Sequence, residues 1–127
     1  MAIAGPPVSP LGDDDWGDFE TAREHYESAL ARLKELLPAD VKIESVCNVS
    51  APARTRAICH ALASALDNLG ELSNTLGDPN SALLRFDDSL RIRESLNQPQ
   101  PLGSTLSRIC YSHILLAKPQ EALAFCN

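Results

Sequence analysis

The chain is 127 residues long and carries a formal net charge of −6, with 44% hydrophobic residues but only 5% aromatic ones. The length suits one compact domain, and apolar residues that are mainly leucine and alanine favour helices packed on helices. The acidic balance disfavours a general nucleic-acid-binding protein, and no apolar run approaches the roughly 18–20 residues that span a membrane.

Residues 1–15 form the first segment and carry three prolines ahead of an aspartate run. Because proline interrupts a regular helix, we predict a flexible or extended lead-in here and a helical domain over residues 16–127. The segment lacks a basic start followed by an apolar core, which is the pattern of a secretory signal. We therefore expect a cytoplasmic protein.

The next segment, residues 18–37, has apolar residues at three- and four-residue steps, which indicates an amphipathic helix. We expect this helix to open at Gly17 and to end at Pro38. A connector over residues 39–52 follows. It is longer than a usual turn between helices, and we expect it to pack partly against them.

A long helix over residues 54–76 and another over residues 79–97 are predicted to form an antiparallel hairpin. Between them, Gly77 can adopt the left-handed conformation that ends a helix, and Asp78 can cap the next one. Pro79 suits the first helical position, because its missing N–H costs nothing there.

Two further helices are predicted over residues 103–116 and 119–127. Pro119 stands 40 residues after Pro79, and each is expected to open a helix. A pattern that recurs at such a fixed distance is typical of a repeat protein.

The order of small and aromatic residues in the central hairpin resembles a tetratricopeptide repeat, in the longer variant of about forty residues. The matching residues are Leu69, Gly70, Gly77, Ala82 and Phe86, and parts of the same pattern are carried by Gly17, Ala22, Tyr26 and Ala122. The resemblance implies an all-α fold in which antiparallel helical hairpins stack as an α-solenoid. The first repeat would lack its first helix and the last repeat much of its second. We therefore expect either a piece of a longer array or a protein that covers its ends by self-association.

The four cysteines, Cys47, Cys59, Cys110 and Cys126, are widely and irregularly spaced, and none forms a C-x-x-C pair. This spacing disfavours a zinc site. We expect free thiols in a reducing cytosol instead, with Cys59 and Cys110 acting as small core residues.

The sequence contains no recognisable catalytic or cofactor-binding pattern. Its three histidines are not at metal-binding spacing, and neither a nucleophile elbow nor a phosphate-binding glycine loop is present. We therefore expect no enzyme activity, no cofactor and no metal.

The resemblance also implies where a partner would bind, because the first helix of each hairpin lines the concave face of a tetratricopeptide array. Polar and aromatic positions expected to be exposed in that groove are Asp67, Asn68, Glu71, Asn74, Ser104, Arg108 and Tyr111. Asn68 and Arg108 match two positions at which one subfamily grips the terminal carboxylate of a peptide. Ser104, however, replaces a lysine of that clamp.

The leading hypothesis is therefore a non-enzymatic scaffold module that binds a protein or peptide in this groove. One alternative is a regulatory sensor for a small peptide or metabolite, which would need a ligand-sized concave pocket. Another is a self-assembling structural module, in which the end helices of separate copies pair and form homo-oligomers.

Overall fold

The computed structural model describes residues 13–97 and 99–116, and all of its regular elements are helices. No β-strand occurs in these residues, so the predicted all-α fold is confirmed. No helix in this part of the chain is both long and apolar enough to cross a membrane. The elements are α1 (Asp13–Glu35), α2 (Ile43–Val46), α3 (Ala53–Thr75), α4 (Pro79–Leu96) and α5 (Pro99–Leu115).

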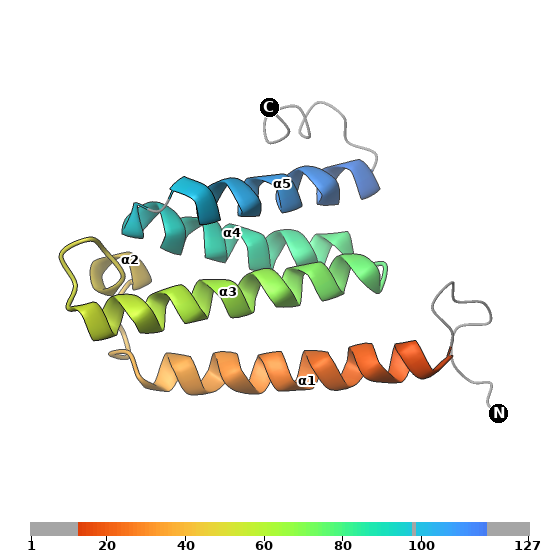
Figure 1. Cartoon of the computed structure of the whole chain (residues 1–127), viewed down its shortest axis with the longest axis horizontal. Helices are drawn as coiled ribbons and strands as arrows, with labels where there is room; N and C mark the ends of the chain where they lie inside the picture. The colour runs from red at the N-terminus through yellow and green to blue at the C-terminus, as the bar shows by residue number, and fades with distance from the viewer. Residues whose placement is uncertain (1–12, 98, 117–127) are drawn as a thin grey trace.

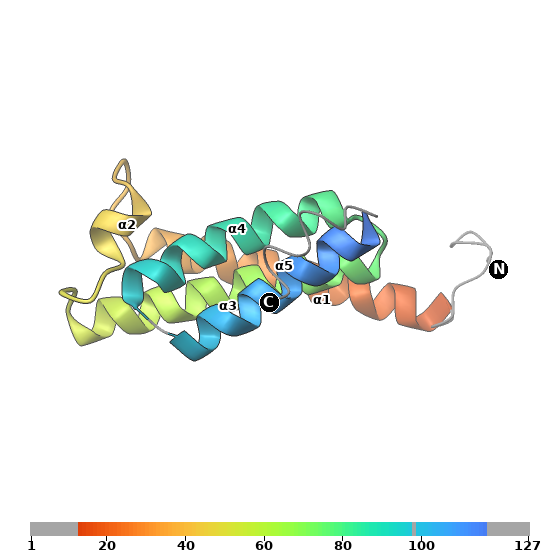
Figure 2. The same cartoon turned by 90° about the horizontal axis from the view of Figure 1, so that it is seen from above.

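The long helices pack in the order α1, α3, α4, α5, and successive helices alternate in direction (Figure 1). α3 packs on both α1 and α4, and α4 packs on α5. As a consequence, α3 and α5 run in the same direction and touch each other along one side of the hairpin. The short α2 stands at one end of the helical body and contacts α4 (Figure 2).

The hairpin between α3 and α4 closes through the turn residues that the sequence predicts. Gly77 takes the left-handed conformation, with φ at +85°. The carboxylate of Asp78 accepts the hydroxyl of Ser81 at 2.6 Å and its backbone N–H at 3.3 Å, and Pro79 begins α4. The hydroxyl bond, followed by the N–H bond, holds the pKa of Asp78 below its ordinary value.

The main apolar core is built around α3. Leu62, Leu66 and Leu69 of α3 are only 2–3% exposed, and they belong to one cluster with Leu30 of α1 and Ile92 of α4. Because these residues come from three helices, the cluster joins α1 to the hairpin.

A second apolar cluster joins α4 to α5. It contains Ala82 and Phe86 of α4 and Ile109 of α5, all buried. Gly70 of α3 faces the ring of Phe86 so closely that a methyl group in its place would lie 2.6 Å from the ring carbon Cζ. Only a residue without a Cβ allows this approach. This contact explains why the repeat pattern pairs a glycine on α3 with an aromatic residue on α4.

The first helix begins earlier than predicted. α1 starts at Asp13, inside the segment expected to be a lead-in, and Gly17 lies within the helix rather than at its opening. The residues from Asp13 to Asp15 thus belong to α1. The predicted helix over residues 119–127, which includes Ala122, lies outside the described residues.

The prediction of free thiols is wrong. Cys47 and Cys59 form a disulfide with their Cα atoms 5.7 Å apart, and both residues are fully buried. The connector turns back after α2 and brings Cys47 against the second turn of α3, a contact that irregular cysteine spacing does not indicate. Cys110 is disulfide-bonded as well. The expectation of a reducing cytosol loses its support, because disulfides persist mainly in oxidising compartments.

Candidate functional site

Polar side chains line the contact between α3 and α5. Because the two helices run in the same direction, residues three or four apart on α3 meet residues three or four apart on α5. Three hydrogen-bonded pairs follow this pattern: Asp67 with Thr105, Glu71 with Arg108, and Asn74 with Ser112. We call the surface formed by the accessible members of these pairs, Glu71, Asn74 and Arg108, together with Asn68, Ser104, Ser107 and Tyr111, the α3–α5 face.

Beneath this face, Asp67 forms a buried ion pair with Arg93 of α4. Nη2 of Arg93 lies 2.9 Å from Oδ2 of Asp67, and the two side chains are 5% and 4% exposed. The hydroxyl of Ser64 accepts a further bond from the same nitrogen at 3.3 Å. The expectation that Asp67 is an exposed groove residue is therefore wrong, because Arg93 draws its carboxylate into the interior.

Sequence reasoning missed this pair, although α4 holds a signal for it. Arg93 follows Phe86 and Ser89 and precedes Leu96 at three- and four-residue steps, and all three of these neighbours are buried. An arginine on such a helical face must find an acceptor inside the protein. Its position therefore predicts an acidic partner on a neighbouring helix.

Two shallow hollows open on the α3–α5 face, and Arg108 borders both of them. The larger, with a volume of about 370 Å³, is lined by Glu71, Asn74, Thr75, Ser107, Arg108 and Tyr111. The smaller, of about 230 Å³, is lined by His60, Ser64, Asp67, Asn68, Arg93, Ser104 and Arg108. The residues predicted for the groove thus lie along one surface, with Asp67 beneath it.

Arg108 is held by carboxylates of α3. Its Nε donates to Glu71, and its Nη1 lies 3.7 Å from Oδ2 of Asp67, while the side chain as a whole is 30% exposed. Its positive charge is already paired with carboxylates of α3, whereas an arginine that binds the carboxylate of a peptide is unpaired before binding. Ser104, which stands at the lysine position of such a clamp, is exposed and brings no charge.

The face offers an exposed aromatic ring, and a donor that has no partner among the described residues lies beneath it. Tyr111 is 54% exposed at the edge of the larger hollow, where its ring offers contact area. At the smaller hollow, Nη1 of Arg93 is buried and has no hydrogen-bond partner within the part of the chain that the structure describes. A ligand oxygen that reached this nitrogen would satisfy a donor that is costly to leave unpaired.

Metal chemistry has no visible support in the described residues. No three histidine, cysteine, aspartate or glutamate side chains of residues 13–97 and 99–116 come together in a way that could hold a metal ion.

Comparison with known proteins bears on the central hairpin. A family model described as tetratricopeptide repeat matches residues 62–101, which run from the middle of α3 through the turn and α4 into the start of α5. Neither the curated proteins nor the solved structures give a match to this chain. The matched segment holds the Gly70–Phe86 contact and the Gly77 turn described above, and the chain therefore carries a repeat of the tetratricopeptide family.

Proposed function

We propose that the chain is a non-enzymatic scaffold module that binds a protein or an extended peptide on its α3–α5 face. The observation that carries this proposal is the pair of adjoining hollows, both lined by residues with polar groups, with the exposed ring of Tyr111 at the edge of the larger one. Helical repeat proteins of this family use their surfaces mainly to hold other proteins, which supports the same assignment.

The chemistry of the face suits a peptide backbone. An extended segment offers one N–H and one C=O group per residue, and the hollows offer polar partners such as Asn68, Ser104 and Ser107. Tyr111 would supply the rigid aromatic contact that often dominates the binding energy of an interface. Arg108 would serve mainly to position Glu71 and the floor of the hollows.

The test is a selection of random peptides on the purified protein, followed by calorimetry of the selected peptides. Truncation of a central aromatic residue commonly costs about 2 kcal/mol, so Tyr111→Ala should weaken binding about thirtyfold. Leu84→Ala serves as the matched control, because Leu84 is 70% exposed on α4 and lines neither hollow. Peptides that bind both variants as tightly as the parent protein would place the site elsewhere.

Self-assembly is a second candidate, and one observation favours it. Tyr111, Ile114 and Leu115 form an exposed apolar row on α5, with 54%, 56% and 43% exposure. By the 40-residue spacing of the chain, Tyr111 and Ile114 correspond to Glu71 and Asn74, the residues through which α3 holds α5. A second copy could therefore pack a helix on this row.

Light scattering after size exclusion, over a concentration series, tests assembly. Ile114→Glu should shift a concentration-dependent dimer to a monomer, because a charge at an apolar interface is costly to desolvate. A parent chain that stays monomeric at every concentration would exclude this candidate and leave the peptide-binding proposal standing.

The cytoplasmic location expected from the sequence depends on the redox state of the cysteines. Rapid alkylation of cell extracts, followed by mass spectrometry of the peptides that contain Cys47 and Cys59, measures that state directly. Alkylated thiols would favour the cytoplasm, whereas an intact disulfide would favour an oxidising compartment.

A further inference from the structure

We propose that a separate apolar pocket at the end of α1 binds a small aliphatic carboxylate, such as a medium-chain fatty acid. This proposal goes beyond the α3–α5 face and does not depend on it. The pocket has a volume of about 460 Å³. Sites for small molecules span about 300–1,000 Å³ and are mostly apolar with a few polar groups, so its size and character fit that class.

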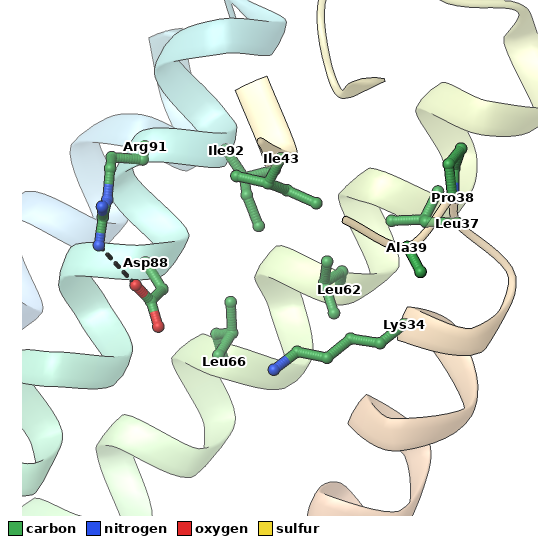
Figure 3. Close-up of a pocket in the computed structure, with 10 residues that line it drawn as sticks. All are labelled: Lys34, Leu37, Pro38, Ala39, Ile43, Leu62, Leu66, Asp88, Arg91 and Ile92. Carbon is green, nitrogen blue, oxygen red and sulfur yellow. Dashed lines mark hydrogen bonds and ion pairs between the residues drawn. The ribbon is translucent and has the colours of Figure 1, made fainter. Parts of the chain in front are cut away.

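The walls of the pocket come from four parts of the chain (Figure 3). Leu62 and Leu66 of α3 and Ile92 of α4 form one side, and each of these leucines and the isoleucine is 2–3% exposed. The segment that follows α1 and the helix α2 form the other side, where Leu37 and Ile43 are half-buried. An aliphatic chain placed here would contact apolar side chains from several directions.

The pocket also holds a positive charge that forms no ion pair with any of the described residues. Lys34, in the last turn of α1, lines the pocket, and Figure 3 shows its side chain extending across it in the direction of Leu66. Arg91 and Asp88 also line the pocket but bind each other at 2.6 Å. Within residues 13–97 and 99–116, Lys34 has no ion-pair partner. An anionic head group beside an apolar chain complements this arrangement.

The connector keeps the wall of the pocket in place. Ile43 is the first residue of α2, and its backbone carbonyl accepts a hydrogen bond from the backbone N–H of Cys47 at 2.7 Å. Cys47 is in turn joined to Cys59 of α3 by the disulfide. Cys59 precedes Leu62 by one turn on the same helix, so the bond fixes one wall of the pocket against the other. The connector lies before the segment that matches the family repeat, so one wall of the pocket comes from outside that segment, whereas the wall of Leu62, Leu66 and Ile92 belongs to it.

The first experiment measures the binding of octanoate, 1-octanol and octylamine to the whole chain by calorimetry. Octanoate should bind saturably with one molecule per chain. The uncharged alcohol should bind about tenfold more weakly because it lacks the charge-assisted contact with Lys34, and the amine should bind weakest of all. Equal binding of octanoate and octylamine, or no saturable binding of octanoate, would overturn the proposal.

Three exposed positions give variants that leave the core intact. Lys34→Met should weaken octanoate about tenfold and leave octanol unchanged, whereas Lys42→Met, which removes an exposed lysine outside the pocket lining, should change neither. Ala39→Phe should fill the pocket and abolish binding of both ligands. Octanoate that binds the Lys34→Met or the Ala39→Phe protein as tightly as the parent would place its site elsewhere.

The last experiment tests the wall. A Cys47→Ala/Cys59→Ala double variant should release the connector and weaken octanoate severalfold, while peptides selected on the α3–α5 face should bind as before. Unchanged octanoate binding in a folded double variant would show that the disulfide does not shape this pocket.

Discussion

The two sides of α3 hold their neighbours by different means. On the side toward α5, contacts are polar and directional, and each donor meets a particular acceptor, as in the pairs of Asp67 with Thr105 and Asn74 with Ser112. On the side toward α1 and the connector, Leu62 and Leu66 pack with apolar residues that have no preferred direction, and a pocket remains. Hydrogen bonds therefore set the register between helices, whereas apolar packing sets only their closeness.

The polar side should be the more sensitive of the two to loss of one partner. Asp67→Ala leaves the buried guanidinium of Arg93 without its carboxylate, which should cost about 3–5 kcal/mol of unfolding free energy. Urea denaturation measures the loss. Asp87→Ala removes an exposed partner of Arg91 and should cost under about 0.5 kcal/mol. Equal effects of the two substitutions would mean that the buried pair contributes no more than a surface pair.

The apolar side should tolerate truncation better. Leu66→Ala should cost about 2–3 kcal/mol, at the lower end of the usual range, because Leu66 already borders the open pocket. Phe86→Ala is the comparison, since Phe86 is fully buried and lines none of the described hollows; its loss should cost about 3–5 kcal/mol. If Leu66→Ala proved the more destabilising of the two by thermal and urea unfolding, the pocket would be tightly closed in solution.

Between these two sides, the Gly70 position allows a test of close approach. Gly70→Ala should cost about 1–3 kcal/mol, because the new methyl group overlaps the ring of Phe86. Phe86→Leu removes the ring, so Gly70→Ala introduced into the Phe86→Leu protein should change the free energy of unfolding very little. A comparison of the two single variants with the double variant measures this. Additive losses in that cycle would mean that the strain arises elsewhere.

The smallest effect on stability is expected at Asp78, in the turn between α3 and α4. Its pKa in the folded protein lies below the ordinary value of 3.8, so the charged cap stabilises the fold above that pH and loses its effect as the pH falls through the folded-state pKa. Asp78→Asn retains a capping side chain without the charge. The difference in melting temperature between the two proteins should therefore narrow below about pH 3.8 and should not widen.

Local signals explain how much of the fold is predictable. The turn depends on Gly77 and Asp78 alone, and the helices follow from apolar residues at three- and four-residue steps, so both can be read directly. The start of α1 could not be predicted in this way, because the prolines ahead of it suggested that the aspartate run also lay outside the helix. In the structure α1 nevertheless starts at Asp13.

The candidate site is predictable only in its outline. Repeat spacing brings Asn68, Glu71 and Arg108 to one face, but it does not show that Glu71 and Arg108 hold each other. The burial of Asp67 depends on Arg93, 26 residues away on another helix, and no local pattern at Asp67 reveals it. The pocket depends in the same way on the path of the connector.

The bond between Cys47 and Cys59 has a topological consequence. The peptide chain and the disulfide together close a covalent ring over the end of the connector and the start of α3. A protease that cuts once inside this ring opens it without releasing a fragment, so α1 remains joined to α3 until a reductant is added. The nicked protein would run as one band on a denaturing gel without reductant and as two bands with it, and its helices would still share one molecule after the backbone between them is cut.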